Sequence, residues 1–170
     1  MKPFQKNLGL LSPYTVAQDI FGAKLNQNEA PLDVRSRLKQ EIGMKLESFS
    51  WNRYPPAASP RLLRKLSDYY EVPSSGILLG NGSNELILTL LLAVCGRGGE
   101  ILTVKPGFAV IKRFASLLPA KILEAPLDEN LEFDVPSLLR NAARARLVFL
   151  TSPHNPTGGV LDSKEIETLA

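Results

Sequence analysis

The sequence predicts an α/β fold built on a mostly parallel sheet in three layers. Three observations support this prediction. Short apolar runs alternate with longer helical patterns in the second half of the chain, turn-forming glycines and prolines bound the runs, and the last run shows no polar alternation. Because strands that alternate with helices are joined by right-handed crossovers, the strands should be parallel, with helices on both faces.

The first part of the chain is less regular. Residues 1–35 contain no long periodic segment, and we interpret them as extended pieces held by turns. Residues 34–46 have helical spacing. The apolar face of that helix contains Val34, Leu38, Ile42 and Leu46.

A second helix is expected after the proline-stiffened residues 52–56 (NRYPP). Serine is a good N-cap and proline fits the first helical position, so Ser59 and Pro60 should begin this helix. It should continue to about Tyr70, because the sequence VPS then ends it.

The remaining elements follow a strand, loop and helix rhythm. Strands are expected at residues 77–79, 101–104, 121–125 and 147–150. Helices are expected at residues 86–94, 108–118 and 135–143 and from 164 onward. The helix at 86–94 is apolar almost all round, which predicts deep burial. Asp134 and Asp162 stand where N-caps of the last two helices are needed.

The composition is that of an ordinary globular chain, with 170 residues, 44% hydrophobic and 22% charged. The net charge of +3 is not gathered in a basic stripe, so we expect no nucleic-acid partner. The longest apolar stretch falls short of the ~20 residues of a membrane span. No secretory signal is recognisable at the N-terminus. The single Cys95 cannot form an internal disulfide, and we expect a cytoplasmic protein.

The most informative stretch is residues 147–159 (LVFLTSPHNPTGG), a buried strand that leads into a stiff loop. Ligands bind at that end of the strands in open α/β sheets. Pro153 and Pro156 restrict the backbone around Asn155, whose amide is therefore presented rigidly. The amide could hold a polar ligand atom or close a turn on its own backbone. The peptide bond before each of these prolines could be either cis or trans.

A second loop, residues 80–85 (GNGSNE), lies between a predicted strand and a predicted helix. The backbone amides of Gly82, Ser83 and Asn84 should point outward at the positive end of the helix dipole, as in phosphate-binding loops. The alternative is an ordinary cap with Ser83 as the N-cap and Glu85 in the first turn.

An aromatic residue, Phe108, follows another predicted strand. Its ring could stack on a flat ligand ring or pack in the core. A phosphorylated planar cofactor would contact Phe108, the amide of Asn155 and the loop at residues 80–85. No residue is assigned as a metal ligand.

Three motifs together carry a family resemblance. GNGSNELI, KPGF and LVFLTSPHNPTG, in that order, resemble the fold-type-I pyridoxal-phosphate-dependent aminotransferases. LSPY, LNQNEAP and NRYPP, which precede them, are similar to the histidinol-phosphate branch of that family. The resemblance covers nearly the whole chain and corresponds to the N-terminal part of the family's proteins.

The resemblance implies pyridoxal 5'-phosphate as cofactor and assigns roles to residues. Ser83 and Asn84, in the loop that contains Gly82, would hold the phosphate through backbone amides. Phe108 would stack on the pyridine ring, and Asn155 would bind the phenolic oxygen of the ring. His154 is interpreted as a loop residue and not as a catalytic base.

Further assignments concern the rest of the site and the domains. Tyr54 would reach the phosphate across a homodimer interface, and Tyr14 and Asn28 fall where the family lines its substrate pocket. Residues 1–52 would form the N-terminal arm and part of the smaller domain. Residues 53–170 would begin the cofactor-binding large domain, which is incomplete in this chain.

The family's Schiff-base lysine is expected downstream, so no residue here is assigned as catalytic. Lys164 opens an expected surface helix and is no substitute. We therefore expect the 170-residue chain to be an inactive fragment when alone. The implied reaction transfers an amino group between a small-molecule donor, histidinol phosphate, and a 2-oxo acid, 2-oxoglutarate, in histidine biosynthesis. A lyase of the same fold, similar to threonine-phosphate decarboxylases, and a catalytically inactive fragment are the alternatives.

Overall fold

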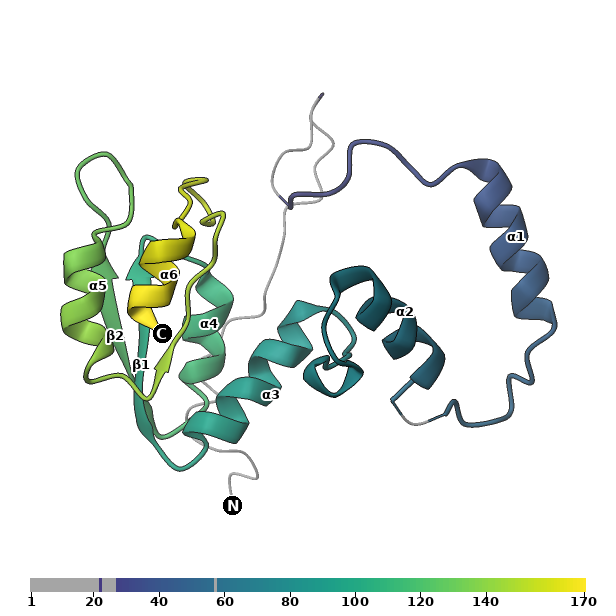
Figure 1. The fold of residues 1–170 in the computed structure, drawn as a ribbon, viewed down its shortest axis with the longest axis horizontal. Helices are drawn as coiled ribbons and strands as arrows, with labels where there is room; N and C mark the ends of the chain where they lie inside the picture. Colours follow the sequence, from purple (N-terminus) through teal and green to yellow (C-terminus); the bar gives the residue numbers. More distant parts are fainter. Residues whose placement is uncertain (1–21, 23–26, 57) are drawn as a thin grey trace, which may run out of the picture. The chain divides into compact units, whose positions relative to one another are not determined.

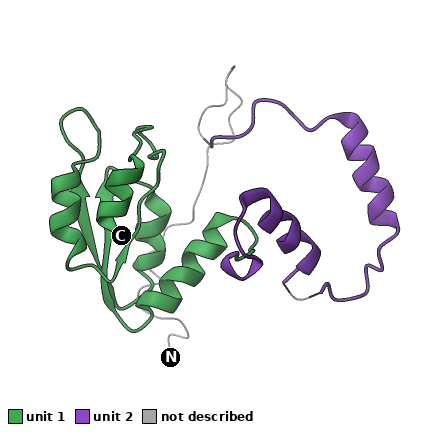
Figure 2. Ribbon diagram, in the orientation of Figure 1, with its two compact units in different colours: residues 1–12, 78–170 green, residues 13–77 purple. Residues whose placement is uncertain are grey.

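The computed structural model describes residue 22 and residues 27–56 and 58–170 (Figure 1). These residues belong to two compact units (Figure 2). We call residues 78–170 the sheet unit and the described residues up to 77 the helical unit. The predicted domain boundary after residue 52 separates a smaller domain from the cofactor-binding large domain, and it stays a prediction.

The sheet unit is built on three parallel strands, as the alternation of elements predicted. They are β1 (Gly99–Lys105), β2 (Ala120–Pro126) and β3 (Leu147–Val148), in the order β2-β1-β3. In the register of the sheet, Ile101 of the central strand lies between Ile122 and Leu147. The central strand is the most buried, since four consecutive residues from Ile101 to Val104 are at most 3% exposed.

Helices cover both faces of this sheet, which confirms the α/β fold (Figure 1). On one face, α3 (Ser83–Cys95) and α4 (Ala109–Ala115) pack in a cluster that includes Ile101. On the other face, α5 (Val135–Ala142) and α6 (Ser163–Leu169) pack in a cluster that includes Leu102. Neighbouring residues of β1 thus serve opposite faces, as the two-residue period of a strand requires.

The strand predicted at residues 77–79 is wrong. A 3₁₀ turn, η2 (Ser74–Gly76), is followed by backbone that pairs with no strand among the described residues. Leu78 is 68% exposed, so its apolar side chain has no sheet face to cover. A short apolar run becomes a strand only when another strand supplies hydrogen-bond partners, and local sequence does not show whether one does.

The deep burial predicted for the helix at 86–94 is also only partly right. Helix α3 buries Ile87, Leu91 and Cys95, whereas Leu90 and Leu92 are 43% and 51% exposed. The buried residues recur every four positions and form one face. Burial of Cys95 as a free thiol agrees with its predicted role as a small apolar residue.

Side-chain caps begin the two helices on the second face, as predicted. Asp134 accepts a hydrogen bond from the backbone N–H of Ser137 at 2.9 Å. Asp162 and Glu165 form a reciprocal capping box, with bonds of 2.7 and 2.8 Å. Each cap satisfies N–H groups that lack a partner within the helix.

The helical unit contains both helices that the spacing predicts. They are α1 (Ser36–Glu47) and α2 (Pro60–Tyr70), and no side chain of either is buried. Ser59 holds the N-cap position of α2, but its φ of 42° is left-handed and its hydroxyl makes no capping bond. The apolar stripe on α1 is exposed, with Leu38 and Ile42 each 48% accessible. Among the described helices of both units, none combines the length and apolarity needed to cross a membrane.

Candidate functional site

Two loops meet at the carboxyl edge of the sheet. One follows β1 and contains Pro106 and Phe108, and the other follows β3 and contains Asn155. Because β1 and β3 are parallel neighbours, their carboxyl ends lie at the same edge. A hydrogen bond of 2.9 Å between His154 Nε2 and the carbonyl oxygen of Pro106 joins the two loops. The structure therefore brings together two of the three predicted ligand-binding segments.

Asn155 is half-buried, and its side-chain amide is not used to close a turn. Its backbone N–H donates to Thr151 Oγ1 at 3.3 Å, while no hydrogen bond within the described part of the chain involves its side chain. The peptide bonds before Pro153 and Pro156, left open by the sequence, are both cis. Since no hydrogen bond among the described residues uses the side chain of Asn155, its amide keeps both donor and acceptor for a ligand.

Phe108 occupies the N-cap position of α4 without a side-chain capping bond. It is half-buried and packs against the cluster that contains Ile101. Core packing, one of its two predicted roles, is therefore observed, and stacking on a ligand stays a prediction. The preceding Gly107 allows the tight return of the loop, since a Cβ there would lie 2.4 Å from the carbonyl oxygen of Val104.

The start of α3 has the geometry of an anion site. Gly82 is the N-cap, with φ 83° and ψ 167°, a backbone conformation that glycine alone adopts readily. Ser83 is the first helical residue and not the N-cap, so that part of the alternative prediction is wrong, whereas Glu85 lies in the first turn, as the alternative also predicted. The carboxylate of Glu85 accepts a bond from the N–H of Asn81. In the described residues, the N–H groups of Ser83 and Asn84 have no hydrogen-bond acceptor.

Helix α3, which these amides begin, packs in the same apolar core as Phe108. Ile87, one turn after Ser83, belongs to the cluster against which Phe108 packs. No hydrogen bond of the described residues links Ser83 or Asn84 to Asn155. Placement of all three segments around one ligand therefore stays a prediction.

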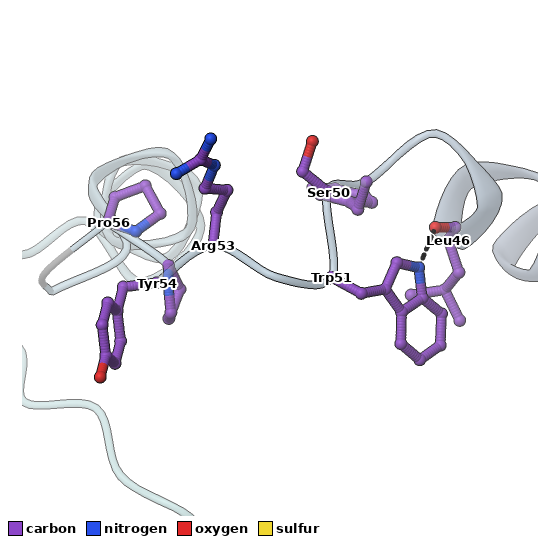
Figure 3. Close-up of a pocket in the computed structure, with 8 residues that line it drawn as sticks. Leu46, Ser50, Trp51, Arg53, Tyr54 and Pro56 are labelled. Carbon is purple, nitrogen blue, oxygen red and sulfur yellow. Dashed lines mark hydrogen bonds between the residues drawn. The ribbon is translucent and has the colours of Figure 1, made fainter.

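Tyr54 belongs to the helical unit and is 99% exposed. It lines an open hollow with Arg53 and Trp51, and its ring extends away from Trp51, whose Nε1 donates to the carbonyl oxygen of Leu46 at 3.0 Å (Figure 3). The exposed phenol has no core role within this unit, and its contact across a dimer interface stays a prediction.

The predicted substrate residues are less informative. Tyr14 lies outside the described residues, and Asn28 is exposed with φ 53°. Near Asn28 in the sequence, Asp33 is an exposed carboxylate that accepts hydrogen bonds from the Lys39 ammonium and from the backbone N–H of Val34. These bonds, first that of Lys39, hold the pKa of Asp33 below its usual value.

His154 and Thr151 are the site residues whose importance sequence reasoning missed. His154 was predicted to be a loop residue, which is correct, but its side chain is 4% exposed and joins two loops. Thr151 Oγ1 lies 3.2 Å from His154 Nδ1. The available signal was a threonine directly after the strand predicted at residues 147–150 and three residues before a histidine. In the described ranges, no group of three or more His, Cys, Asp or Glu side chains could hold a metal ion.

Comparison with known proteins gives a consistent family. The model of the family "Aminotransferase class I and II" matches residues 22–170. A curated relative from Chlorobium phaeovibrioides (strain DSM 265 / 1930), named histidinol-phosphate aminotransferase, is 39% identical over 149 residues. The match covers 86% of this chain and 41% of the relative. The chain thus spans about two fifths of the length of this relative.

Solved structures share the fold. A putative histidinol-phosphate aminotransferase from Erwinia carotovora atroseptica has a TM-score of 0.74 and 25% identity, covering 85% of this chain and 42% of that chain. Histidinol-phosphate aminotransferase from Sinorhizobium meliloti, in complex with pyridoxal-5'-phosphate, has a TM-score of 0.84 and 17% identity. This second match covers 99% of the present chain and 47% of that chain, and it supports the fold alone.

Proposed function

Because this chain belongs to the aminotransferase class I and II family, we propose that it supplies the cofactor-binding N-terminal part of a pyridoxal-phosphate-dependent aminotransferase. The observation that carries the proposal is the uncapped start of α3, where the N–H groups of Ser83 and Asn84 have no acceptor among the described residues. A phosphate group fits this position, because the amides and the helix dipole both favour an anion.

The residues at the sheet edge fit the rest of such a cofactor. Phe108 offers an aromatic ring that is partly accessible, which suits a planar pyridine. The side-chain amide of Asn155 can donate to a phenolic oxygen. When bound, pyridoxal phosphate withdraws electrons from the carbon that bears the amino group of the donor. The role of these residues is to bind and orient it, and we assign the covalent step to residues outside the present sequence.

The proposed substrates are histidinol phosphate and 2-oxoglutarate. The names of the curated relatives support the first, and since transfer of an amino group needs a carbonyl acceptor, we propose this 2-oxo acid as the second. We propose that Tyr14 and Asn28 line the substrate pocket. In a homodimer, Tyr54 would reach the phosphate from the other subunit, and its 99% exposure leaves it available for that contact. The buried free thiol of Cys95 supports a reducing, cytoplasmic compartment.

Replacing Asn155 by alanine tests the cofactor assignment. Loss of a donor to the phenolic oxygen destabilises its ionised form, so the pKa of the bound chromophore should rise. A hydrogen bond to a charged group contributes ~1.5–3 kcal/mol, which corresponds to a rise of about 1–2 pH units. The measurement is a pH titration of the absorption spectrum of the complete protein with pyridoxal phosphate bound.

Asn130→Ala is the matched control, because Asn130 is an exposed loop residue whose backbone N–H, not its side chain, bonds Asp128. This variant should titrate like the unaltered protein. If Asn155→Ala also titrates unchanged, Asn155 does not bind the phenolic oxygen. If the unaltered protein does not bind pyridoxal phosphate, the proposed function itself is wrong.

A product assay tests the substrates. With histidinol phosphate and 2-oxoglutarate, the complete protein should form glutamate in an amount equal to the amino donor consumed, because the amino group moves from one substrate to the other. Carbon dioxide released from an amino-acid phosphate, without glutamate, would instead identify a lyase of the same family. The two products are separated by coupled glutamate detection and by trapping of carbon dioxide.

A further inference from the structure

His154 is a buried titratable side chain that the proposed function does not use. Thr103, Ser137 and His154 are the buried polar residues in the described part of the chain, with exposures of 3%, 5% and 4%. Thr103 and Ser137 each have one side-chain polar atom, whereas the imidazole of His154 has two nitrogens that both need hydrogen-bond partners. An imidazole is retained at so buried a position only if hydrogen bonds offset its loss of water.

Both ring nitrogens have partners, and these partners define the tautomer. The carbonyl oxygen of Pro106, 2.9 Å from Nε2, can only accept, so Nε2 must carry a hydrogen. In a neutral ring Nδ1 is then an acceptor, and the hydroxyl of Thr151, 3.2 Å away, donates to it.

The same hydroxyl connects the imidazole to the predicted ligand residue. Thr151 Oγ1 accepts the backbone N–H of Asn155 at 3.3 Å while its own hydrogen is directed to His154. A continuous path therefore runs from the backbone of Asn155 through Thr151 and His154 to Pro106. The last bond of the path joins His154 and Pro106, which are 48 residues apart in the sequence.

The imidazole is also fixed by its surroundings. Phe133 packs edge-on against it, with ring centroids 5.2 Å apart and an angle of 64° between the planes. The backbone of His154 is held twice, since its N–H donates to the carbonyl of Gly159 and its carbonyl accepts the N–H of Gly158, both at 2.7 Å. These contacts constrain both the backbone and the ring plane of His154, so the imidazole is a well-defined link between the loops.

We propose that His154 is a positioning residue that holds the loop containing Phe108 and the loop containing Asn155 in fixed relation, so that both contact one cofactor. The inference rests on the proposed function for its consequence, but the link between the loops is independent of it. His154 acts through Pro106 and Thr151 and does not itself touch the cofactor.

Two substitutions separate the two ends of the link. The side-chain nitrogen of glutamine lies as many bonds from Cα as Nε2 of histidine, so His154→Gln keeps a donor for Pro106. The side chain of asparagine ends at the level of Nδ1, so His154→Asn keeps a partner for Thr151 and loses the bond to Pro106. One neutral hydrogen bond corresponds to a change of about 3- to 10-fold in an equilibrium constant.

The complete protein is titrated with pyridoxal phosphate, and the absorption of the bound cofactor is followed with pH. His154→Asn should weaken binding about 3- to 10-fold and raise the pH midpoint of the spectrum, in the same direction as Asn155→Ala. His154→Gln should stay within about 2-fold of the unaltered protein, since it keeps the link. Urea unfolding of each variant is measured in parallel, because a merely structural role would lower stability without moving the spectrum.

Equal affinity and spectrum in His154→Asn and the unaltered protein would overturn the proposal, as would a glutamine variant that behaves like the asparagine variant. Imidazole ¹⁵N NMR of the unaltered protein without added cofactor provides a test that needs no variant to fold. A hydrogen on Nε2 is expected, and a ring that carries no hydrogen on Nε2 would overturn the proposal. If the unaltered protein binds no pyridoxal phosphate, the proposed function fails, while the NMR result still decides whether the loops are joined as described.

Discussion

Ser83→Pro should weaken pyridoxal phosphate binding by roughly 10- to 100-fold, because one hydrogen bond to a charged group is lost. Ser83 is the first residue of α3, a position where proline is tolerated since the N–H has no helical partner. The extended ψ of 167° at Gly82 also suits a following proline. The substitution therefore removes one amide donor from the proposed phosphate site and leaves the helix intact. The dissociation constant, from a titration of the complete protein followed by absorption, is the measurement.

The matched control for this experiment is Ser83→Ala, which removes the hydroxyl and keeps the backbone N–H. If the amide is the ligand, alanine should bind pyridoxal phosphate within a few-fold of the unaltered protein and proline should not. Equal losses in the two variants would assign the contact to the hydroxyl. Equal and undiminished binding in both would exclude the start of α3 as the phosphate site.

Leu102→Ala is expected to lower the free energy of unfolding by about 2–5 kcal/mol, the range observed for large-to-small substitutions in cores. Leu102 is 0% exposed in the central strand, and it packs in one cluster with Leu138 of α5. Its neighbours in register are Leu123 and Val148, so a truncated side chain leaves a cavity enclosed on both sides. Urea unfolding of the complete protein, followed by circular dichroism, is the measurement.

Leu131→Ala is the control for the core substitution. Leu131 is 51% exposed in the loop between β2 and α5, so its truncation should change the free energy of unfolding by less than about 0.5 kcal/mol. Similar losses at the two positions would contradict the burial described for Leu102.

Much of the sheet unit was predictable because its signals are local. The apolar run at residues 101–104 and the capping residues Asp134 and Asp162 each lie next to the element that they specify. The loops after β1 and β3 were predictable as ligand segments for the same reason, since glycine and proline restrict the backbone wherever they occur. The predicted cofactor contacts of Asn155 and Ser83 are consistent with free polar groups but still require the experiments above.

The sequence by itself determined the helices, the three strands that pair, the loops between them, and the family to which the motifs are similar. Only the tertiary structure decided that residues 77–79 form no strand, that one face of α3 is exposed and that His154 is buried between two loops. The reason is physical. Helical periodicity and turn chemistry depend on neighbours within a few residues, whereas strand pairing, burial and a hydrogen bond such as that from His154 to Pro106 depend on residues brought together by folding.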